Sequence, residues 1–130
     1  MTNNQILIET SGIGSDIIEI ERIRSCIEEH RERFLERVFT AKEQEYCQRH
    51  QESAARFAGR FAAKEAVAKA LGTGIGKMLA WKDIEIINQP SGKPEVHLSP
   101  LAKERFHQPN LLITISHCHL YALAVAIYRA

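Results

Sequence analysis

The fold that we expect for this chain is decided by the sequence FAGRFAAKEAVAKAL, residues 57–71, which Gly72 follows directly. Alanine is the best helix former and no proline interrupts the stretch, so it predicts a long helix. Gly72 stands where many helices end on a residue with positive φ. At about 100° per residue, one stripe of the helix is apolar and should face the core. This stripe contains Phe57, Phe61, Ala68 and Leu71. The small side chains elsewhere should let other segments pack closely on more than one side.

Lys64, Glu65 and Lys69 are charged residues on the same predicted helix. Lys64 falls within the apolar stripe, so its ammonium group must either reach solvent along its methylene groups or pair with an anion. Glu65 lies at the edge of the stripe, one turn before Lys69. That spacing is typical of an ordinary ion pair on an exposed helix face. From the helix alone, this structural interpretation is favoured over a functional one.

Composition and charge exclude several classes of protein. With 130 residues, 45% of them hydrophobic and 25% charged, the chain is expected to form one domain with a conventional core. The formal net charge of +1 gives no long-range attraction to nucleic acid or to membranes. The cysteines, Cys26, Cys47 and Cys118, form neither a C-x-x-C pair nor a disulfide framework, and free thiols suit a reducing cytosol. The sequence shows no signal peptide and no transmembrane segment, so we expect a cytoplasmic protein.

The N-terminal region predicts a strand. Residues 6–18 alternate loosely between isoleucines and small or polar residues. Gly12 and Gly14 within the strand indicate the close approach of another backbone or of a ligand. Asp16 stands near its end, where a carboxylate among isoleucines needs a partner. The structural alternative is that Asp16 caps the helix that follows.

Residues 20–39 predict an amphipathic helix with segregated charges. Its core stripe contains Ile20, Ile23, Ile27, Phe34 and Val38. One flank carries Arg22, Arg33 and Arg37, and the opposite flank carries Glu21, Glu28, Glu32 and Glu36. A basic strip of this kind can bind an acidic partner, although a solvated face is its commoner meaning.

Local signals predict the connecting elements. A capping box at residues 40–43 should start a second helix that runs to about His50, and the central helix should start near Glu52. The glycine run GTGIG at 72–76 ends a helix, which is the wrong context for a Rossmann fingerprint, although its N–H groups could still reach a phosphate. Residues 81–88 and 95–98 predict paired strands around a turn, and 100–107 predict a short helix.

Two apolar runs at 111–115 and 122–128 predict a hairpin in the middle of a sheet, buried on both faces. Their connection places Ser116, His117 and His119 together at one end. Two histidines two residues apart can ligate a metal, but a polar hairpin tip is the commoner explanation. The elements together predict the α+β class. A single compact domain should pack a mostly antiparallel sheet against the central helix and the N-terminal amphipathic helix.

Two separated motifs resemble the bipartite signature of the 4′-phosphopantetheinyl transferases, and within that family the small trimeric bacterial class. They are GIGSD at 12–16 and FAAKEAVAKA at 61–70. The resemblance continues through GTGIG at 72–76, WKDIE at 81–85, GKP at 92–94 and ISH at 115–117, and so covers nearly the whole chain. It implies a reaction in fatty acid biosynthesis. The phosphopantetheine arm of coenzyme A moves to a serine of apo acyl carrier protein, and adenosine 3′,5′-bisphosphate is released.

The resemblance also implies roles for individual residues. Asp16 and Glu65 would hold Mg²⁺ against the diphosphate of coenzyme A, and Lys69 would neutralise the phosphate oxygens and the leaving group. This fits the chemistry, because Mg²⁺ prefers one or two carboxylates plus substrate phosphates. Phosphoryl transfer, moreover, depends mainly on charge neutralisation. The base for the serine would be either Glu65 or a water held by Asp16. The residues that the resemblance places near coenzyme A are Arg60, Lys64, Gly72, Gly74, Ser116 and His117.

The same resemblance implies two kinds of protein contact. The acidic carrier protein would dock on the first helix at Arg22, Arg33 and Arg37, with one residue inserted between the first two of these relative to the family. The chain would also form a homotrimer with its active site between subunits.

Two other classes of function stay open on the residues alone. The first is another metal-dependent phosphate enzyme, such as a nuclease or phosphatase, although such sites commonly gather more carboxylates or histidines around two metals. The second is a non-catalytic module that binds a protein through the basic flank of the first helix. Its activity would survive the substitutions Asp16→Asn and Glu65→Gln.

Overall fold

Residues 10–129 are described by the computed structural model, and their elements follow the expected order. The strands are β1 (Thr10–Glu19), β2 (Ile84–Asn88), β3 (Pro94–Leu98), β4 (Asn110–His117) and β5 (Tyr121–Arg129). The helices are α1 (Ile20–Val38), α2 (Ala41–Gln48), α3 (Ser53–Ala70), α4 (Pro100–Arg105) and the 3-10 turn η1 (Trp81–Asp83). The α+β class predicted from the sequence is confirmed. The predicted first strand continues to Glu19, and its residues 6–9 lie outside the described part.

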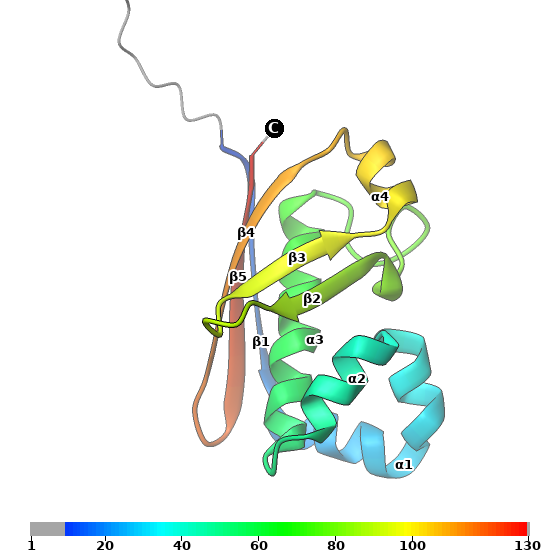
Figure 1. The fold of residues 1–130 in the computed structure, drawn as a ribbon, viewed down its shortest axis with the longest axis vertical. Helices are drawn as coiled ribbons and strands as arrows, with labels where there is room; N and C mark the ends of the chain where they lie inside the picture. Colours follow the sequence, from blue (N-terminus) through cyan, green and yellow to red (C-terminus); the bar gives the residue numbers. More distant parts are fainter. Residues whose placement is uncertain (1–9, 130) are drawn as a thin grey trace, which may run out of the picture.

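Two antiparallel sheets lie on different sides of α3 (Figure 1). The larger sheet has the order β1-β5-β4, so the first and last strands of the chain are neighbours. The smaller sheet is the β2-β3 hairpin, with Ile84 opposite Leu98 and Asn88 opposite Pro94. The N-terminal half of α3 packs with α1 and α2, and its C-terminal half packs with the strands. The central helix is therefore covered on several sides, as its small side chains predicted.

Close packing of α3 against β1 depends on glycines. A Cβ atom built on Gly14 would overlap the carbonyl oxygen of Ala66, and one on Gly12 would overlap that of Ala70. The prediction of a close backbone approach at these two glycines is confirmed. The approach brings the end of β1, which carries Asp16, against the last two turns of α3.

Helix α1 is not the straight helix that a single helical wheel assumes. Arg31 has φ 31° and ψ −105°, so the helix is kinked there. Arg22 lies before the kink, whereas Arg33 and Arg37 lie after it, and all three are exposed. A single helical wheel therefore does not describe α1, and the predicted basic residues are divided between its two segments. The kink falls between Arg22 and Arg33, where the family resemblance indicated an inserted residue.

The C-terminal hairpin forms as predicted, but only one of its faces is buried. Ala122, Ala124 and Ala126 are 0% exposed and face α3, whereas Leu123 is 41% exposed. The same alternation continues on the neighbouring strands, where Ile13 is 67% exposed. The prediction of burial on both faces is wrong because α3 covers one side of this sheet, and no other element in residues 10–129 covers its outer side.

Local capping signals are confirmed, and the element ends differ slightly. The Thr40 hydroxyl accepts from the Glu43 N–H and the Glu43 carboxylate accepts from the Thr40 N–H, as a capping box requires. Ser99 caps α4 in the same way, through the Ala102 N–H. Gly72 has φ 83°, as expected after the last turn of α3. The predicted strand over 81–88 starts only at Ile84, because residues 81–83 form η1.

Candidate active site

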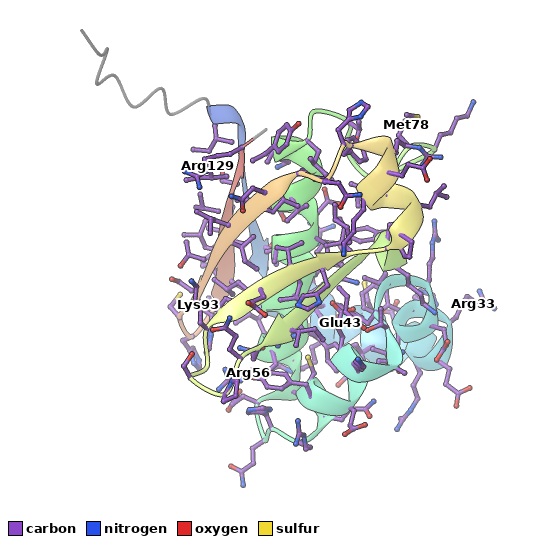
Figure 2. The ribbon with its side chains drawn as sticks, turned by 45° about the horizontal axis from the view of Figure 1, so that its top comes forward. Arg33, Glu43, Arg56, Met78, Lys93 and Arg129 are labelled. Atoms are coloured by element: carbon purple, nitrogen blue, oxygen red, sulfur yellow. The ribbon has the colours of Figure 1, made fainter. Side chains whose placement is uncertain are left out.

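Lys64 is wholly buried, and its ammonium group is saturated with acceptors. Its Nζ atom lies 2.7 Å from Oε1 of Glu43, and it donates to the carbonyl oxygens of Val38 (2.6 Å) and Trp81 (3.2 Å). Both side chains of the pair are 0% exposed, and Figure 2 shows Glu43 in the interior beside α2 and β2. Burial lowers the pKa of Lys64 below its ordinary value, and the Glu43 carboxylate opposes that shift.

The resemblance placed Lys64 near coenzyme A, and the structure places its ammonium group in the interior. An ammonium group has three donors, and here all three are used inside the protein. The sequence required an anionic partner or an exit to solvent for Lys64, and the partner is the Glu43 of the capping box. The second carboxylate oxygen of Glu43 accepts from the N–H of Ile86 at 2.7 Å, so the pair also fixes β2. Sequence reasoning missed this contact, although both residues had been singled out.

A second group of charges lies one turn further along α3. The Lys69 ammonium lies 3.2 Å from Oδ1 of Asp16 and 2.9 Å from the carbonyl oxygen of Ser15. Its side chain is 49% exposed and that of Asp16 is 19% exposed. The structure thus brings Asp16 of β1 beside Lys69 of α3. Asp16 does not cap α1, because Glu19 occupies the N-cap position.

Glu65 completes this group. Partial burial raises the pKa of the Glu65 carboxyl above its ordinary value, the nearby Asp16 carboxylate raises it further, and Lys69 acts in the opposite direction. The two carboxylates are thus close enough to repel each other. A pair of acids held together in this way is stabilised by a cation, and Lys69 supplies one positive charge for two negative ones.

The acid pair fits a magnesium ion by the chemistry of its donors. Mg²⁺ usually takes one or two protein carboxylates and completes its shell with water and substrate phosphates. Within residues 10–129, no group of three or more histidine, cysteine, aspartate or glutamate side chains could hold a metal ion. Asp16 and Glu65 would therefore leave most of the coordination shell to a substrate. The same observation leaves the two histidines of the hairpin tip without further protein ligands.

Arg60 lies in a separate, basic recess. Its guanidinium stacks over the Tyr46 ring at 4.1 Å and donates to the side-chain oxygen of Asn88. The residue is 4% exposed, and among the described atoms its buried Nε has no hydrogen-bond partner. A cavity of about 220 Å³ adjoins it and is also lined by Lys42 and Arg49. This recess can accommodate an anionic group.

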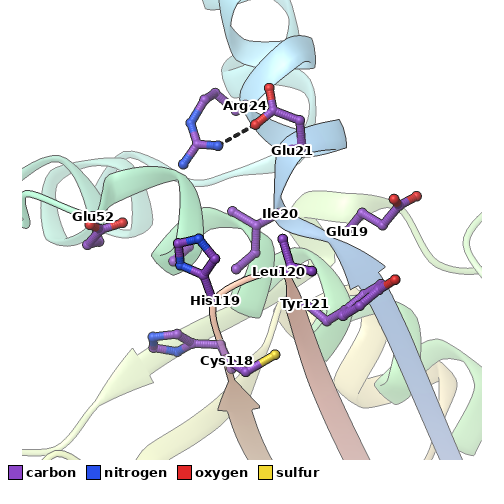
Figure 3. Close-up of a pocket in the computed structure, with 11 residues that line it drawn as sticks. Glu19, Ile20, Glu21, Arg24, Glu52, Cys118, His119, Leu120 and Tyr121 are labelled. Atoms are coloured by element: carbon purple, nitrogen blue, oxygen red, sulfur yellow. Dashed lines mark hydrogen bonds and ion pairs between the residues drawn. The ribbon is translucent and has the colours of Figure 1, made fainter.

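The hairpin tip borders another cavity, of about 580 Å³ (Figure 3). His117 and His119 contribute to its lining, together with Arg24 of α1 and Glu52, the N-cap residue of α3. Ser116 and His117 are both exposed. Within one chain, this cavity is not lined by Asp16, Glu65 or Lys69, so His117 and the acid pair border different spaces.

The glycine run closes α3 and does not open a new helix. Gly72 and Gly74 have φ values of 83° and 68°, and their N–H groups donate to the carbonyl oxygens of Lys69 and Ala68. These two N–H groups therefore cap the end of the helix. The exclusion of a Rossmann fingerprint agrees with this position.

The three cysteines differ in environment. Cys47 is buried, which raises the pKa of its thiol to about 12. Cys118 is exposed at the hairpin tip, where backbone N–H groups lower the pKa of its thiol. All three, including Cys26, are free.

Comparison of this sequence with models of protein families shows which family has this fold and this pair of acids. The family model described as the 4′-phosphopantetheinyl transferase superfamily matches residues 12–126. The chain therefore belongs to this superfamily.

Similar proteins within the superfamily share one description. A holo-[acyl-carrier-protein] synthase of Protochlamydia amoebophila is 56% identical over 121 residues, which cover 93% of this chain and 99% of that protein. The holo-[acyl-carrier-protein] synthase of Chlamydia felis is 52% identical over 120 residues, covering 92% of this chain and 98% of its own.

Solved structures that resemble this chain carry the same description. The holo-[acyl-carrier-protein] synthase of Helicobacter pylori, crystallised in complex with coenzyme A, is 38% identical, with a TM-score of 0.82 over 89% of this chain and 98% of that one. The Neisseria meningitidis enzyme of the same name gives a TM-score of 0.87 at 29% identity, covering 93% of this chain and 99% of its own.

Proposed function

We propose that this chain transfers the 4′-phosphopantetheine moiety of coenzyme A to a serine of apo acyl carrier protein, as in fatty acid biosynthesis. The products are holo acyl carrier protein and adenosine 3′,5′-bisphosphate. The relatives named above support the reaction, and one observation in the chain itself carries it. Asp16 of β1 lies beside Lys69 of α3, in a group that Glu65 completes.

Asp16 and Glu65 are the proposed metal ligands, and the bound Mg²⁺ would polarise the diphosphate of coenzyme A. Lys69 would balance negative charge on the transferred phosphate and on the leaving group. The serine hydroxyl of the carrier gives its proton to a base, either Glu65 or a water held by Asp16. Its oxygen forms the new bond to phosphorus as the bond between that phosphorus and the oxygen of the leaving adenosine 3′,5′-bisphosphate breaks. The protein's task at this site is to bind, orient and neutralise charge rather than to form a covalent intermediate.

The rest of coenzyme A needs further positive charge. Arg60, with Lys42 and Arg49 beside it, is suited to bind a phosphate of the nucleotide end. Ser116 and His117, near the hairpin tip, are exposed, and we propose that they contact coenzyme A held at the acid pair of another chain. Lys64 is left out of this assignment, and Gly72 and Gly74 contribute the shape of the loop rather than phosphate contacts.

A homotrimer would explain why the outer face of the larger sheet is apolar. The side chains of Ile13, Ile17, Leu112 and Leu123 are all more than two-fifths exposed there. Apolar patches of this kind mark protein interfaces. A trimeric site between subunits would also bring His117 of one chain nearer to the acid pair of another. Light scattering should therefore give three chains per particle, and a monomeric mass would contradict this part of the proposal.

The acidic carrier protein is proposed to dock on α1. Arg22, Arg33 and Arg37 are exposed on its two segments, and Figure 2 shows Arg33 extending away from the molecule. Because the kink separates them, we propose Arg22 as the main contact and Arg33 and Arg37 as secondary ones.

One catalytic domain and a cytoplasmic location complete the proposal. The family match over residues 12–126 supports a single domain. Three free thiols suit a reducing compartment. Among the described helices, none combines the length and apolarity needed to cross a bilayer.

Mass spectrometry of the carrier protein tests the reaction. We expect incubation with coenzyme A, Mg²⁺ and apo acyl carrier protein to add one phosphopantetheine to the carrier, and EDTA to stop the transfer.

Asp16→Asn and Glu65→Gln should each lower the transfer rate by about a hundredfold or more while the proteins stay folded. Glu104→Gln, at an exposed acid of α4, is the matched control and should change nothing. Full transfer by the Asp16→Asn variant would refute the assignment.

A further inference from the structure

Lys69 contacts the acid that would hold the divalent ion. Its ammonium lies 3.2 Å from Oδ1 of Asp16 and 2.9 Å from the Ser15 carbonyl oxygen, so it reaches from α3 across to β1. It also acts on Glu65, where it opposes the pKa rise caused by burial and by Asp16. One lysine thus partly neutralises both acids of the pair.

A divalent cation and this ammonium group compete for the same charge. Both are drawn to Oδ1 of Asp16, and they repel each other when they share it. With the charges about 4 Å apart, even water-like screening leaves a repulsion that corresponds to a loss of about tenfold or more in cation affinity. A cation that binds alone must therefore displace the Lys69 ammonium from Asp16, or bind more weakly because of its repulsion.

The diphosphate of coenzyme A changes this competition. Lys69 is half exposed on a flexible four-carbon stem, so its ammonium can move from Asp16 to a phosphate oxygen without repacking the core. That transfer frees the Asp16 oxygen for the cation and places the ammonium on the substrate. Nothing comparable is open to Lys64, which is enclosed by Glu43 and two carbonyl oxygens.

We propose that Lys69 couples the two ligands: it opposes a divalent cation that arrives alone and favours one that binds together with coenzyme A. This inference rests on the proposed function, because it needs Asp16 and Glu65 to be the cation ligands. Since binding linkage is reciprocal, the cation must raise the affinity for coenzyme A by the same factor. The cation then binds tightly only when coenzyme A is also bound.

Binding of Mn²⁺, followed by electron paramagnetic resonance of the free ion, tests the coupling without turnover. The dissociation constant is measured with and without saturating coenzyme A, in the absence of carrier protein. For Lys69→Met we expect Mn²⁺ alone to bind about tenfold more tightly than to the wild type. The tightening caused by coenzyme A should shrink by about the same factor. Lys69→Arg keeps the charge and should stay close to the wild type.

Two further variants make the result decisive. Lys103→Met removes an exposed positive charge from α4, and it should leave Mn²⁺ binding unchanged. Unchanged or weaker Mn²⁺ binding to folded Lys69→Met would overturn the inference, as would equal tightening in Lys103→Met. Asp16→Asn separates this outcome from failure of the proposed function. If Asp16→Asn binds Mn²⁺ as the wild type does, the cation site itself is wrong.

Discussion

Two lysines on α3, little more than one turn apart, are each paired with an acid from another element, and their surroundings are opposite. Lys64 and Glu43 are both 0% exposed, and every donor of the ammonium group has an acceptor. Lys69 is 49% exposed and shares its charge between Asp16 and Glu65. In the sequence, Lys64 falls within the apolar stripe of the helix, whereas Lys69 follows Glu65 at the spacing of an exposed ion pair.

The difference shows how one helix can serve both stability and chemistry. A buried pair whose donors and acceptors are all satisfied is costly to break, because either partner alone is a buried, unpaired charge. An exposed group with excess negative charge contributes little to stability but can accept a cation or a phosphate-bearing ligand. We therefore assign Lys64 and Glu43 to the fold, and Asp16, Glu65 and Lys69 to the reaction.

The largest expected effect comes from breaking the buried pair. Lys64→Met leaves the Glu43 carboxylate buried without its cation and should lower the free energy of unfolding by about 3 to 5 kcal/mol. Chemical denaturation at pH 7 measures this loss.

The matching substitution Lys69→Met should cost less than about 1 kcal/mol in the same measurement, since its pair is exposed. Equal losses of stability for the two lysines would remove the distinction between them.

Arg22 lies outside both lysine pairs, and its substitution tests a third role, the docking of the carrier protein. Arg22 is exposed on α1 and belongs to the proposed docking surface for the carrier. Arg22→Glu should raise the KM for acyl carrier protein by about tenfold at low salt, and less at high salt. Steady-state kinetics should show an unchanged KM for coenzyme A. A change confined to coenzyme A would show that Arg22 belongs to the nucleotide site instead.

A smaller effect concerns Glu65 and its pH dependence. Its pKa in the folded chain is raised, so the folded state holds this proton more tightly than the unfolded state does. The contribution of Glu65 to stability is therefore present below the ordinary pKa of glutamate and is lost as pH rises through the folded pKa. With EDTA present, Glu65→Gln should be slightly more stable than the wild type at pH 7, by less than about 1 kcal/mol.

Thermal melts across pH check this sign. The advantage of Glu65→Gln should shrink as pH falls and vanish well below the ordinary pKa of glutamate, where the wild-type carboxyl is protonated in both states. An advantage that grows toward acid would mean that Glu65 is stabilised as a carboxylate in the fold.

The smallest effect is expected at the kink of α1. Arg31 has a positive φ, which side chains with a Cβ disfavour and glycine tolerates. Arg31→Gly should raise the free energy of unfolding by about 0.5 kcal/mol and leave both lysine pairs undisturbed. A melt that shows destabilisation would indicate that the Arg31 side chain makes a contact that offsets its backbone strain.

Much of the fold follows from local signals in the sequence. Alanine content and Gly72 predict α3, the capping box predicts α2, and Gly12 and Gly14 predict the tight packing of β1. These predictions succeed because helix propensity, helix capping and the small size of glycine can each be recognised from a few neighbouring residues.

The rest depends on contacts between distant segments. The apolar strands of the hairpin do not reveal that α3 covers only one of their faces, because that depends on what lies outside the sheet. The partner of Lys64 comes from another helix, so spacing along α3 could show that a partner was needed but not which one. The resemblance supplied Asp16, Glu65 and Lys69 as a group, but it did not supply the buried pair of Lys64 with Glu43.

Glu43→Gln and Glu65→Gln, measured side by side for thermal stability and for transfer to the carrier, test the division of roles most directly. The account predicts that Glu43→Gln loses about 3 kcal/mol or more of stability, yet keeps its transfer rate within about threefold below its melting temperature. It predicts that Glu65→Gln keeps its stability and loses transfer by about a hundredfold or more. If Glu65→Gln keeps its transfer rate, or if Glu43→Gln stays as stable as the wild type, the account is contradicted.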